Sequence, residues 1–461
     1  MQARFEPMTP LKEKIIISGA GLVGSLLAIY LAKKNYQVEV YEKRPDPRKA
    51  ALHAGRSINL ALSDRGWRAL EGAGIAAQIR EMGIPMQGRL MHDAQGKLTY
   101  QPYGKDGQAI FSVSRGGLNQ KLIETAAAFE NVNFHFEKET AAVYLDSQKI
   151  AFQDTTSLES AAQIEQAEVI IAADGAFSPV RYAMQKLPRF NYSQHYIEHA
   201  YKELTILPTA EGKHQIESNV LHIWPRKNFM LIALPNLDGS FTCTLFLAYQ
   251  GQEDSFENLQ TESQILAFFE KYFPDILPLM PNLVADFRSN PTASLVTVRC
   301  DTWVAGRFAL IGDAAHAIVP FYGQGMNAGF EDCTILNQIL EQEKGDWDKI
   351  LPRYERERVA NGQAIADLAL QNFVEMRDKV ADKKFLLTKK VEAHLQNAYP
   401  HIWQPLYSLV TFSHLPYAQA LQIGKEQEAI MEKFMRSYTG DESLESVLAE
   451  IDLDQIVAAK Q

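Results

Sequence analysis

Three stretches of this sequence pair glycine with an acidic residue where a buried strand would end. Gly19-Ala20-Gly21-Leu22-Val23-Gly24 fits the pattern G-x-G-x-x-G, and Asp174-Gly175 and Gly312-Asp313 each follow an apolar run. Glycine lets backbone N–H groups approach a phosphate closely, and the start of a helix favours negative charge. These residue types, at these places, could therefore hold the phosphates and ribose of a nucleotide cofactor.

The first stretch has the context that its motif requires. A β-branched run, 15–17, precedes it, and apolar residues recur at helical spacing from Leu22 to Ala32. A second alternating strand then ends at Glu42, 18 residues after Gly24. Strand, glycine turn, helix, strand and acid together predict an adenine-dinucleotide site.

Each part of this motif has a separate physical task. Gly19 permits the tight turn, Gly21 lets the backbone approach a pyrophosphate, and Gly24 lets helix and strand pack closely. Glu42 can accept hydrogen bonds from the ribose hydroxyls, which favours FAD or NAD over tightly bound NADP. An incidental glycine-rich turn is the alternative, and it does not explain the terminal acid.

Two later features are less specific. A glycine-rich loop, 323–329, opens a helix and is again suited to receive negative charge. Asn372 interrupts the apolar stripe of a long helix expected over 348–376, where it is either a satisfied core amide or a ligand contact. Arg56 follows the dinucleotide strand in a loop, where it either reaches a cofactor phosphate or is simply solvated.

The elements that must position these residues indicate an α/β protein with an insertion. The chain of 461 residues is long enough for more than one domain. Between 195 and 249, aromatic and β-branched residues alternate and turns separate them, which predicts an inserted antiparallel sheet. A hairpin is expected from 88–92 and 97–100. From 376 to the end, the pattern favours helices.

Composition excludes several classes of function. A net charge of −10 and a pI near 5.7 argue against a nucleic-acid-binding surface. The three cysteines have no C-x-x-C spacing, so neither a disulfide framework nor a zinc finger is expected. The uncharged stretch 15–32 fits a βαβ turn better than a membrane span, and we expect a soluble cytoplasmic protein without a membrane partner.

One motif suggests a metal and is disfavoured. His195-Tyr196-Ile197-Glu198-His199 matches H-x-x-E-H, a zinc-peptidase pattern. That site needs a helix to bring both histidines and the acid onto one face, whereas the flanking residues predict a strand. No metal is therefore expected.

The three glycine–acid signatures, in this order, resemble the aromatic-ring flavoprotein monooxygenases with a p-hydroxybenzoate-hydroxylase-like fold. The resemblance covers about the first 375 residues and implies that all three hold one FAD. It implies an FAD-binding Rossmann-like domain over 1–183 and 297–375. A β-sheet substrate domain is expected over 184–296 with a contribution from 85–110, and a C-terminal helical region over 376–461. The residues expected to contact FAD are Gly19, Gly21, Leu22, Val23, Gly24, Glu42, Lys43, Arg44, Ala54, Arg56, Arg115, Asp174, Asp313, Gly325, Met326 and Asn327.

Within that group, the chain looks like the kynurenine 3-monooxygenase family. The segments that carry this resemblance include 55–62, 101–104, 223–226, 241–246, 323–332, 375–377 and 405–407. In that family an arginine and a tyrosine 14 residues apart hold the substrate carboxylate, and Arg89 and Tyr103 have this spacing. An asparagine before Glu-Met-Arg and a later tyrosine match Asn372 and Tyr407. Members from mitochondria end in a membrane helix that this chain lacks, so it resembles the soluble bacterial type.

The resemblance implies hydroxylation of L-kynurenine to 3-hydroxy-L-kynurenine with NADPH and O2. The oxygen chemistry would belong to the flavin hydroperoxide, so no catalytic acid or base of the protein is nominated. Another FAD hydroxylase acting on a phenol or an anthranilate-like compound is the first alternative. A flavin-binding protein that has lost catalysis and a zinc hydrolase are the others. A homodimer is the remaining expectation.

Overall fold

The structure is a computed structural model that describes residues 11–49, 59–104, 107–157, 160–251, 254–376, 382–450 and 452–460. Its first large sheet has six strands in the order β18-β19-β12-β1-β2-β8. All neighbours are parallel except β18 and β19. The strands are β1 (Lys12–Ser18), β2 (Tyr36–Glu42), β8 (Val132–Phe136), β12 (Val169–Ala172), β18 (Val304–Ala305) and β19 (Phe308–Leu310). The parallel βαβ unit predicted from the sequence is thus confirmed.

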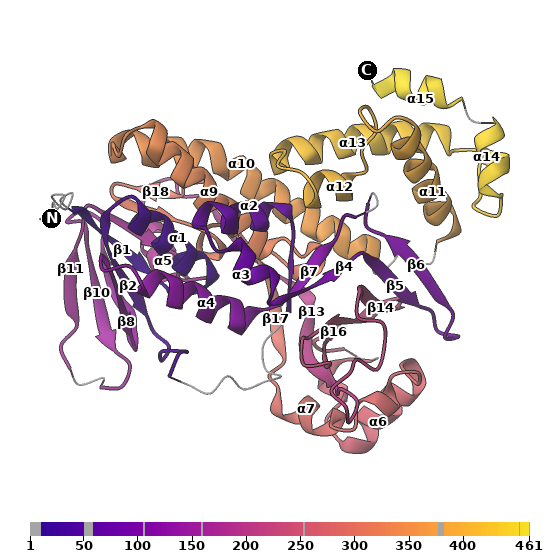
Figure 1. Cartoon of the computed structure of the whole chain (residues 1–461), viewed down its shortest axis with the longest axis horizontal. Coiled ribbons are helices and arrows are strands. Elements are labelled where there is room, and N and C mark those ends of the chain that lie inside the picture. Colours follow the sequence, from indigo (N-terminus) through magenta and orange to yellow (C-terminus); the bar gives the residue numbers. More distant parts are fainter. Residues whose placement is uncertain are drawn as a thin grey trace, which may run out of the picture.

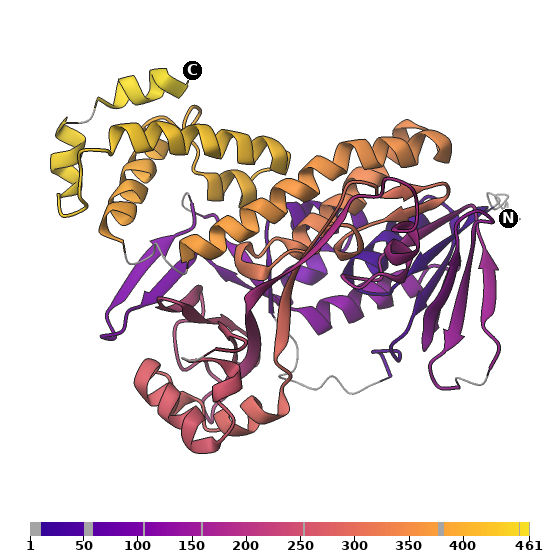
Figure 2. The same ribbon diagram turned by 180° about the vertical axis from the view of Figure 1, so that it is seen from behind.

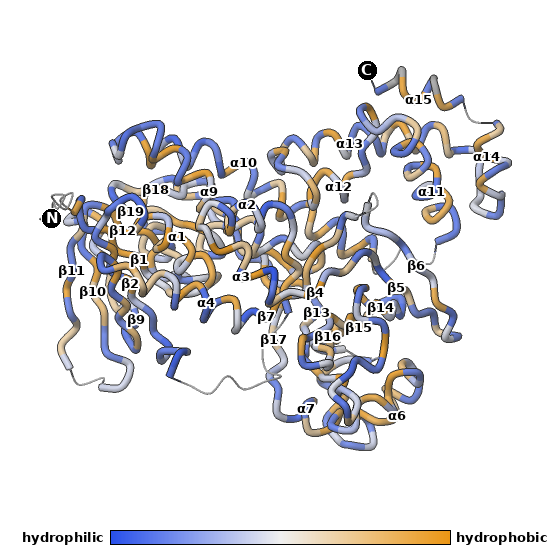
Figure 3. Tube along the Cα trace, in the orientation of Figure 1, coloured by the Kyte–Doolittle hydropathy of each residue, from blue (hydrophilic) through white to orange (hydrophobic). Residues whose placement is uncertain are grey.

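Helices cover one face of this sheet. They are α1 (Leu22–Lys33), α2 (Asp64–Ala73), α3 (Ala76–Arg80), α4 (Arg115–Ala127), α9 (Gly325–Gln342) and α10 (Trp347–Val374). Helix α1 lies between the sheet and its neighbours α4 and α9, and it is buried from Gly24 to Ala32. A helix buried on all sides is apolar on all sides, which explains the uncharged stretch. Figure 3 shows this concentration of hydrophobic residues in β1, β12 and α1.

The opposite face carries a small sheet that the sequence did not predict. Strands β9 (Lys138–Tyr144), β10 (Lys149–Asp154) and β11 (Gln163–Gln166) form it, and α5 (Pro179–Met184) packs beside β9. The rings of Tyr41 on β2 and Phe152 on β10 stack with centroids 3.8 Å apart. This contact holds the small sheet against the parallel one.

The second large sheet has seven strands in the order β17-β13-β16-β15-β14-β5-β6. These are β5 (Gly88–His92), β6 (Leu98–Pro102), β13 (Tyr192–Ile206), β14 (Val220–Arg226), β15 (Phe229–Pro235), β16 (Phe241–Ala248) and β17 (Ala293–Cys300). Every neighbouring pair is antiparallel except β14 with β5. The predicted hairpin, β5 and β6, therefore joins the inserted sheet through a parallel pairing.

Helices α6 (Glu262–Tyr272) and α7 (Leu283–Ser289) cover the outer face of this second sheet (Figures 1 and 2). Their apolar residues share one core with β13, β15 and β16. A fourth sheet, also small, consists of β3 (Asn59–Leu62), β7 (Ile110–Ser114) and β4 (Gly83–Met86) and completes the central part of the molecule.

The C-terminal region is helical, as predicted. It comprises α11 (Lys383–Ala398), α12 (Leu406–Thr411), α13 (Tyr417–Phe434), α14 (Leu444–Glu450) and α15 (Leu453–Lys460). Helix α13 packs along α10 and α12, and α11, α13, α14 and α15 share a separate apolar core around the buried Trp403. Within the described ranges, no helix combines the length and apolar character that crossing a membrane requires.

The segment that resembles a zinc peptidase lies on β13, in an extended conformation as predicted. His195 and Glu198 are exposed, whereas the buried His199 packs its ring against Phe373. The described part of the chain holds no group of three or more metal-binding side chains.

Candidate active site

A cavity of about 870 Å³ is lined both by the ends of the parallel strands and by the seven-stranded sheet. Its walls include one turn from each of the three glycine–acid signatures, brought together from positions about 300 residues apart. Most of the residues singled out from the sequence line it, namely Gly19, Gly21, Leu22, Val23, Glu42, Lys43, Arg44, Arg89, Tyr103, Arg115, Asp174, Asp313, Gly325, Met326 and Tyr407.

Three of the expected residues lie behind the wall. Gly24 and Asn372 are buried next to lining residues, and Asn327 is 0 % exposed. The Asn327 side chain accepts a hydrogen bond from the Ser63 backbone at 3.0 Å, and it donates to the carbonyls of Ala61 and Gly323 at 2.9 Å each. Asn327 therefore holds the loop at Gly323 and does not face the cavity. Ala54 and Arg56 lie outside the described residues.

The glycines of the first turn serve different purposes. Gly19 has φ +105°, and a Cβ there would lie 2.4 Å from the carbonyl oxygen of Ala173. A Cβ on Gly24 would lie 2.0 Å from the carbonyl oxygen of Gly19, so both positions demand glycine for packing. A Cβ on Gly21 would meet no atom within 4 Å, because Gly21 faces the open cavity. Gly21 thus leaves room for a group lying along the turn.

Glu42 lies at the end of β2 and is 7 % exposed. One carboxylate oxygen accepts a hydrogen bond from the Ala20 backbone at 2.9 Å. The other accepts from the backbone and the Nε of Arg44, at 3.0 and 3.1 Å. Because a carboxylate can accept about four hydrogen bonds, capacity remains for hydroxyl donors in the cavity.

Asp174 follows β12, and its side chain lines the cavity. Neither of its carboxylate oxygens, both buried, has a hydrogen-bond partner in the described structure. Burial raises the pKa of Asp174 to about 6. A buried acceptor that lines a cavity and lacks a donor is suited to a ligand that brings hydroxyl groups.

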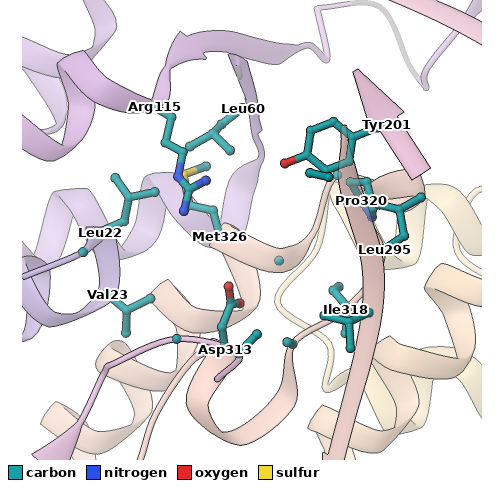
Figure 4. A pocket seen from close by; sticks show the side chains of 18 of the residues that line it. Leu22, Val23, Leu60, Arg115, Tyr201, Leu295, Asp313, Ile318, Pro320 and Met326 are labelled. Atoms are coloured by element: carbon teal, nitrogen blue, oxygen red, sulfur yellow. The ribbon is translucent and has the colours of Figure 1, made fainter. Parts of the chain in front are cut away.

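The third turn lies on the opposite side of the same space. Gly312 has φ +61°, and Asp313 after it begins the short helix α8 (Asp313–His316). Figure 4 shows the Asp313 carboxylate and the Arg115 guanidinium pointing into the cavity from opposite walls. Met326 lies in the first turn of α9, whose N-terminus therefore opens on the cavity. The residues present fit the pyrophosphate, ribose and ring system of a flavin dinucleotide.

The opposite end of the cavity holds a cation beside two stacked aromatic rings. The Arg89 guanidinium lies 4.5 Å from the ring centroid of Tyr407 and 5.3 Å from that of Tyr103. The Nε of Arg89 and the hydroxyl of Tyr103 are buried without a hydrogen-bond partner among the described residues. Burial raises the pKa of the Tyr103 phenol well above its usual value, so the phenol stays protonated and can donate. This arrangement can bind a carboxylate.

The sheet register explains why Arg89 and Tyr103 meet. Gly88 on β5 pairs with Pro102 on β6, so the hairpin places both side chains at the same end of the sheet. The Tyr103 ring then stacks on Tyr407 from α12, with centroids 5.3 Å apart. The 14-residue spacing noted in the sequence is therefore the spacing of two strands folded back on each other.

Asn372, unlike Arg89, Tyr103 and Tyr407, does not line the cavity. Its Nδ2 donates to the carbonyl of Phe321 at 2.7 Å and to the sulfur of Met376 at 3.2 Å. Phe321 and Met376 both line the cavity, whereas Asn372 does not. In this structure its amide holds two wall residues.

Sequence reasoning missed the apolar wall between the two ends of the cavity. Strand β15 contributes every second residue to it, from Met230 through Ile232 to Leu234. Both faces of β15 are buried, so its sequence lacks the polar alternation that would have marked one face as a site wall. Tyr322 was missed as well; it is buried and stacks on Tyr407 at 5.6 Å. The wall suits a flat, apolar ring.

Comparison with known proteins supports a flavin-dinucleotide site in this chain. A family model described as an FAD binding domain matches residues 12–369. Among curated relatives, the kynurenine 3-monooxygenase of Christiangramia forsetii is 49% identical over 437 residues, which is 94% of this chain and 97% of the relative. That of Flavobacterium johnsoniae is 49% identical over 92% of this chain and 94% of its own length. That of Sus scrofa is 42% identical over 89% and 86%.

Solved structures share the fold at lower identity. The tetrameric form of 2-methyl-3-hydroxypyridine-5-carboxylic acid oxygenase aligns with a TM-score of 0.66 and 18% identity, over 85% of this chain and 99% of its own. Pseudomonas aeruginosa PqsL, solved with 2-aminobenzoylacetate, aligns with a TM-score of 0.65 and 19% identity, over 79% and 97%. At this identity the likeness concerns the fold alone.

Proposed function

The chain belongs to the kynurenine 3-monooxygenase family of FAD-dependent monooxygenases, and on that premise we propose which of its residues hold the cofactor and the substrate. It is an NADPH-dependent flavoprotein of the kynurenine pathway that hydroxylates L-kynurenine to 3-hydroxy-L-kynurenine. The relatives do not favour the alternative of another small aromatic substrate. The observation that carries the residue assignments is the convergence of the three glycine–acid turns and the Arg89 cluster on one cavity.

Three turns hold FAD in this proposal. The turn from Gly19 to Gly24 receives the pyrophosphate, for which Gly21 leaves space. Glu42 accepts hydrogen bonds from the adenosine ribose, and Asp174 and Asp313 bind hydroxyl groups farther along the cofactor. When bound, FAD supplies electron transfer from NADPH and the activation of O2. The open start of α9, at Gly325, places a positive helix dipole where it can stabilise negative charge.

Four residues grip the amino-acid part of kynurenine. Arg89 supplies a planar fork to the carboxylate, and the protonated Tyr103 adds a second donor. Tyr407 packs against the Arg89 guanidinium and contributes its hydroxyl. Asn372, whose side-chain amide oxygen can accept a hydrogen bond, completes the set from behind Phe321. Its contact with substrate would require a shift of its amide.

The protein otherwise works by orientation and exclusion of water. The aniline nitrogen of kynurenine donates electron density to the ring carbon ortho to it, so that carbon is already reactive toward an electrophilic oxygen. The apolar wall of Met230, Ile232 and Leu234 holds the ring in one plane. The same wall keeps water away from the reacting atoms. No acid or base of the chain is assigned a catalytic role.

We extend the proposal to the chain as a whole. The FAD-binding domain is assigned to 1–183 and 297–375, the substrate domain to 184–296 with a contribution from 85–110, and the helical region to 376–461. Strand β17 crosses the 296/297 boundary and links the two units. A cytoplasmic location is proposed, which cell fractionation would test. A homodimer is also proposed, which light scattering would test.

The experiment is a substrate-dependent assay of the purified protein. We expect a flavin absorption spectrum, and we expect kynurenine to accelerate NADPH oxidation and to yield the 3-hydroxy product. Phenols and anthranilate serve as comparison substrates. A protein that binds flavin but shows no faster NADPH oxidation with kynurenine than with these compounds would refute the substrate.

A further inference from the structure

A buried network of ion-pairing and hydrogen-bonding side chains connects helix α12 in the C-terminal region with the turn at Asp313. Its members are Arg65 on α2, Glu331 and Asp332 on α9, Arg358 on α10 and His316 on α8, each at most 6 % exposed. None of them lines the cavity. Such groups are costly to bury unless each is paired, so the arrangement needs an explanation.

Arg65 lies at one end of this network of side chains and joins three elements. Its guanidinium forms an ion pair with Glu331. Its Nε donates to the carbonyl of Val410 at 3.0 Å, and a terminal nitrogen donates to the carbonyl of Leu415. Its plane lies 3.9 Å from the ring centroid of Tyr417. Arg65 thus binds both ends of the turn that connects α12 to α13.

The other end of the network is fixed beside the cofactor cavity. Glu331 also pairs with Arg358 at 2.8 Å, and Arg358 pairs with Asp332 at 2.7 Å. The second oxygen of Asp332 accepts hydrogen bonds from His316 at 2.6 Å and from the backbone of Gly312 at 3.1 Å. Gly312 immediately precedes Asp313, so α9 is tied to the third glycine–acid turn.

A second route reaches the same place. The Tyr417 hydroxyl donates to the side chain of Gln324 at 2.9 Å. Gln324 is the N-cap residue of α9 and directly precedes Gly325, which lines the cavity. Tyr417 and Gln324 are both fully buried. The stacked Arg65–Tyr417 pair is therefore attached to α9 at two points.

Helix α12 needs such an attachment. It has only six residues, too few to be stable without tertiary contacts. Tyr407 lies one helical turn before Val410, whose carbonyl Arg65 holds. A cation at the end of a helix is also favoured by the helix dipole. Arg65 therefore holds the backbone of the short helix that carries Tyr407.

We propose that Arg65 is a positioning residue for substrate binding, which sets the Tyr407 ring relative to the cofactor-side helix α9. The inference rests on the proposed role of Tyr407 in gripping kynurenine. Arg65 itself touches neither substrate nor cofactor. Its effect is expected on the affinity for kynurenine and on the share of NADPH consumption that yields hydroxylated product.

The test replaces Arg65 by lysine in the full-length, FAD-loaded enzyme. Lysine keeps the charge but lacks the fork that reaches three acceptors. We expect the dissociation constant of kynurenine, measured by calorimetry without NADPH, to rise about tenfold. We also expect more hydrogen peroxide per NADPH. Arg68→Lys on the same helix is the matched control and should change neither value. An unchanged dissociation constant in a flavin-loaded Arg65→Lys enzyme would overturn the proposal.

A double-mutant cycle separates this inference from the proposed function. Tyr407→Ala alone should weaken kynurenine binding, and adding Arg65→Lys should then cost less than about twofold more, because Arg65 acts through Tyr407. Additive losses would overturn the role of Arg65. If Tyr407→Ala leaves binding unchanged, the substrate grip is wrong, and the inference falls with it.

A charge-balanced variant covers the case in which Arg65→Lys does not fold. Arg65→Met with Glu331→Gln removes one cation and one anion together and leaves the Arg358–Asp332 pair intact. It still lacks the donors to Val410 and Leu415. Weaker kynurenine binding at full flavin content supports the proposal, and wild-type binding refutes it.

Discussion

The replacement of Arg89 by alanine tests the substrate grip most directly. The Arg89 guanidinium faces two aromatic rings, and its Nε has no acceptor within the described residues. A carboxylate would supply that acceptor. A hydrogen bond to a charged group is worth about 1.5–3 kcal/mol. Because about 1.4 kcal/mol corresponds to a factor of ten, the Michaelis constant for kynurenine should rise roughly 10- to 100-fold.

The assay compares two substrates and two control variants. Kynuramine, which is kynurenine without its carboxylate, should be bound about equally well by the wild-type and Arg89→Ala enzymes. Arg89→Lys should fall between them, because lysine keeps the charge but not the bidentate geometry. Arg80→Ala, which removes an arginine that stacks on Trp67 outside the cavity, should leave both substrates unaffected.

The pattern of losses decides the result. A similar loss for kynurenine and kynuramine would mean that Arg89 supports the wall and does not bind the carboxylate. An unchanged Michaelis constant for kynurenine would remove Arg89 from the site. Either result would refute the role of the Arg89 guanidinium in binding the substrate carboxylate.

Three further predictions concern the cofactor turns and the effect of Arg89 on stability. Burial raises the folded-state pKa of Asp174 to about 6, from about 4 when unfolded, so the folded state retains a proton between these values. The unfolding free energy of FAD-free protein should therefore fall by about 2 kcal/mol as pH rises from 4 to 6. Urea unfolding of Asp174→Asn should show a smaller fall. Gly21→Val should abolish flavin binding, measured by absorbance, without lowering the melting temperature of the FAD-free protein. Gly24→Ala should lower that melting temperature, because its Cβ would lie 2.0 Å from the Gly19 carbonyl oxygen. Arg89→Met should raise the melting temperature of the substrate-free enzyme, since it removes a half-buried cation whose Nε has no hydrogen-bond acceptor among the described residues, and a lower melting temperature would contradict this.

Local sequence patterns were enough to predict the cofactor half of the molecule. The turn from Gly19 to Gly24, the helix after it and Glu42 are close in sequence, and each is a direct consequence of backbone geometry. The structure confirms the strands, the helix and the direction of pairing. The hairpin that brings Arg89 to Tyr103 was also local, because its two strands are joined by a short turn.

Some of the details required tertiary information. Ser63 occupies the N-cap position of α2, where a serine commonly caps the helix, but its side chain makes no capping hydrogen bond. Its Oγ lies instead 3.4 Å from the side-chain nitrogen of Gln324, a residue far away in the chain. Asn372 similarly lies on the predicted face of α10, but its partner Phe321 comes from a distant loop. In both cases a long-range acceptor or donor competes with the local one.

The sequence by itself determined that the chain binds a dinucleotide and which family it resembles, because glycine turns, terminal acids and strand periods act over a few neighbouring residues. Only the tertiary structure decided that β15 forms a wall of the cavity, that Tyr322 continues the stack of rings, and that Arg65 holds the helix of Tyr407. These contacts join residues up to 345 positions apart. Such pairings depend on how complete elements pack, and no local pattern of residues records them.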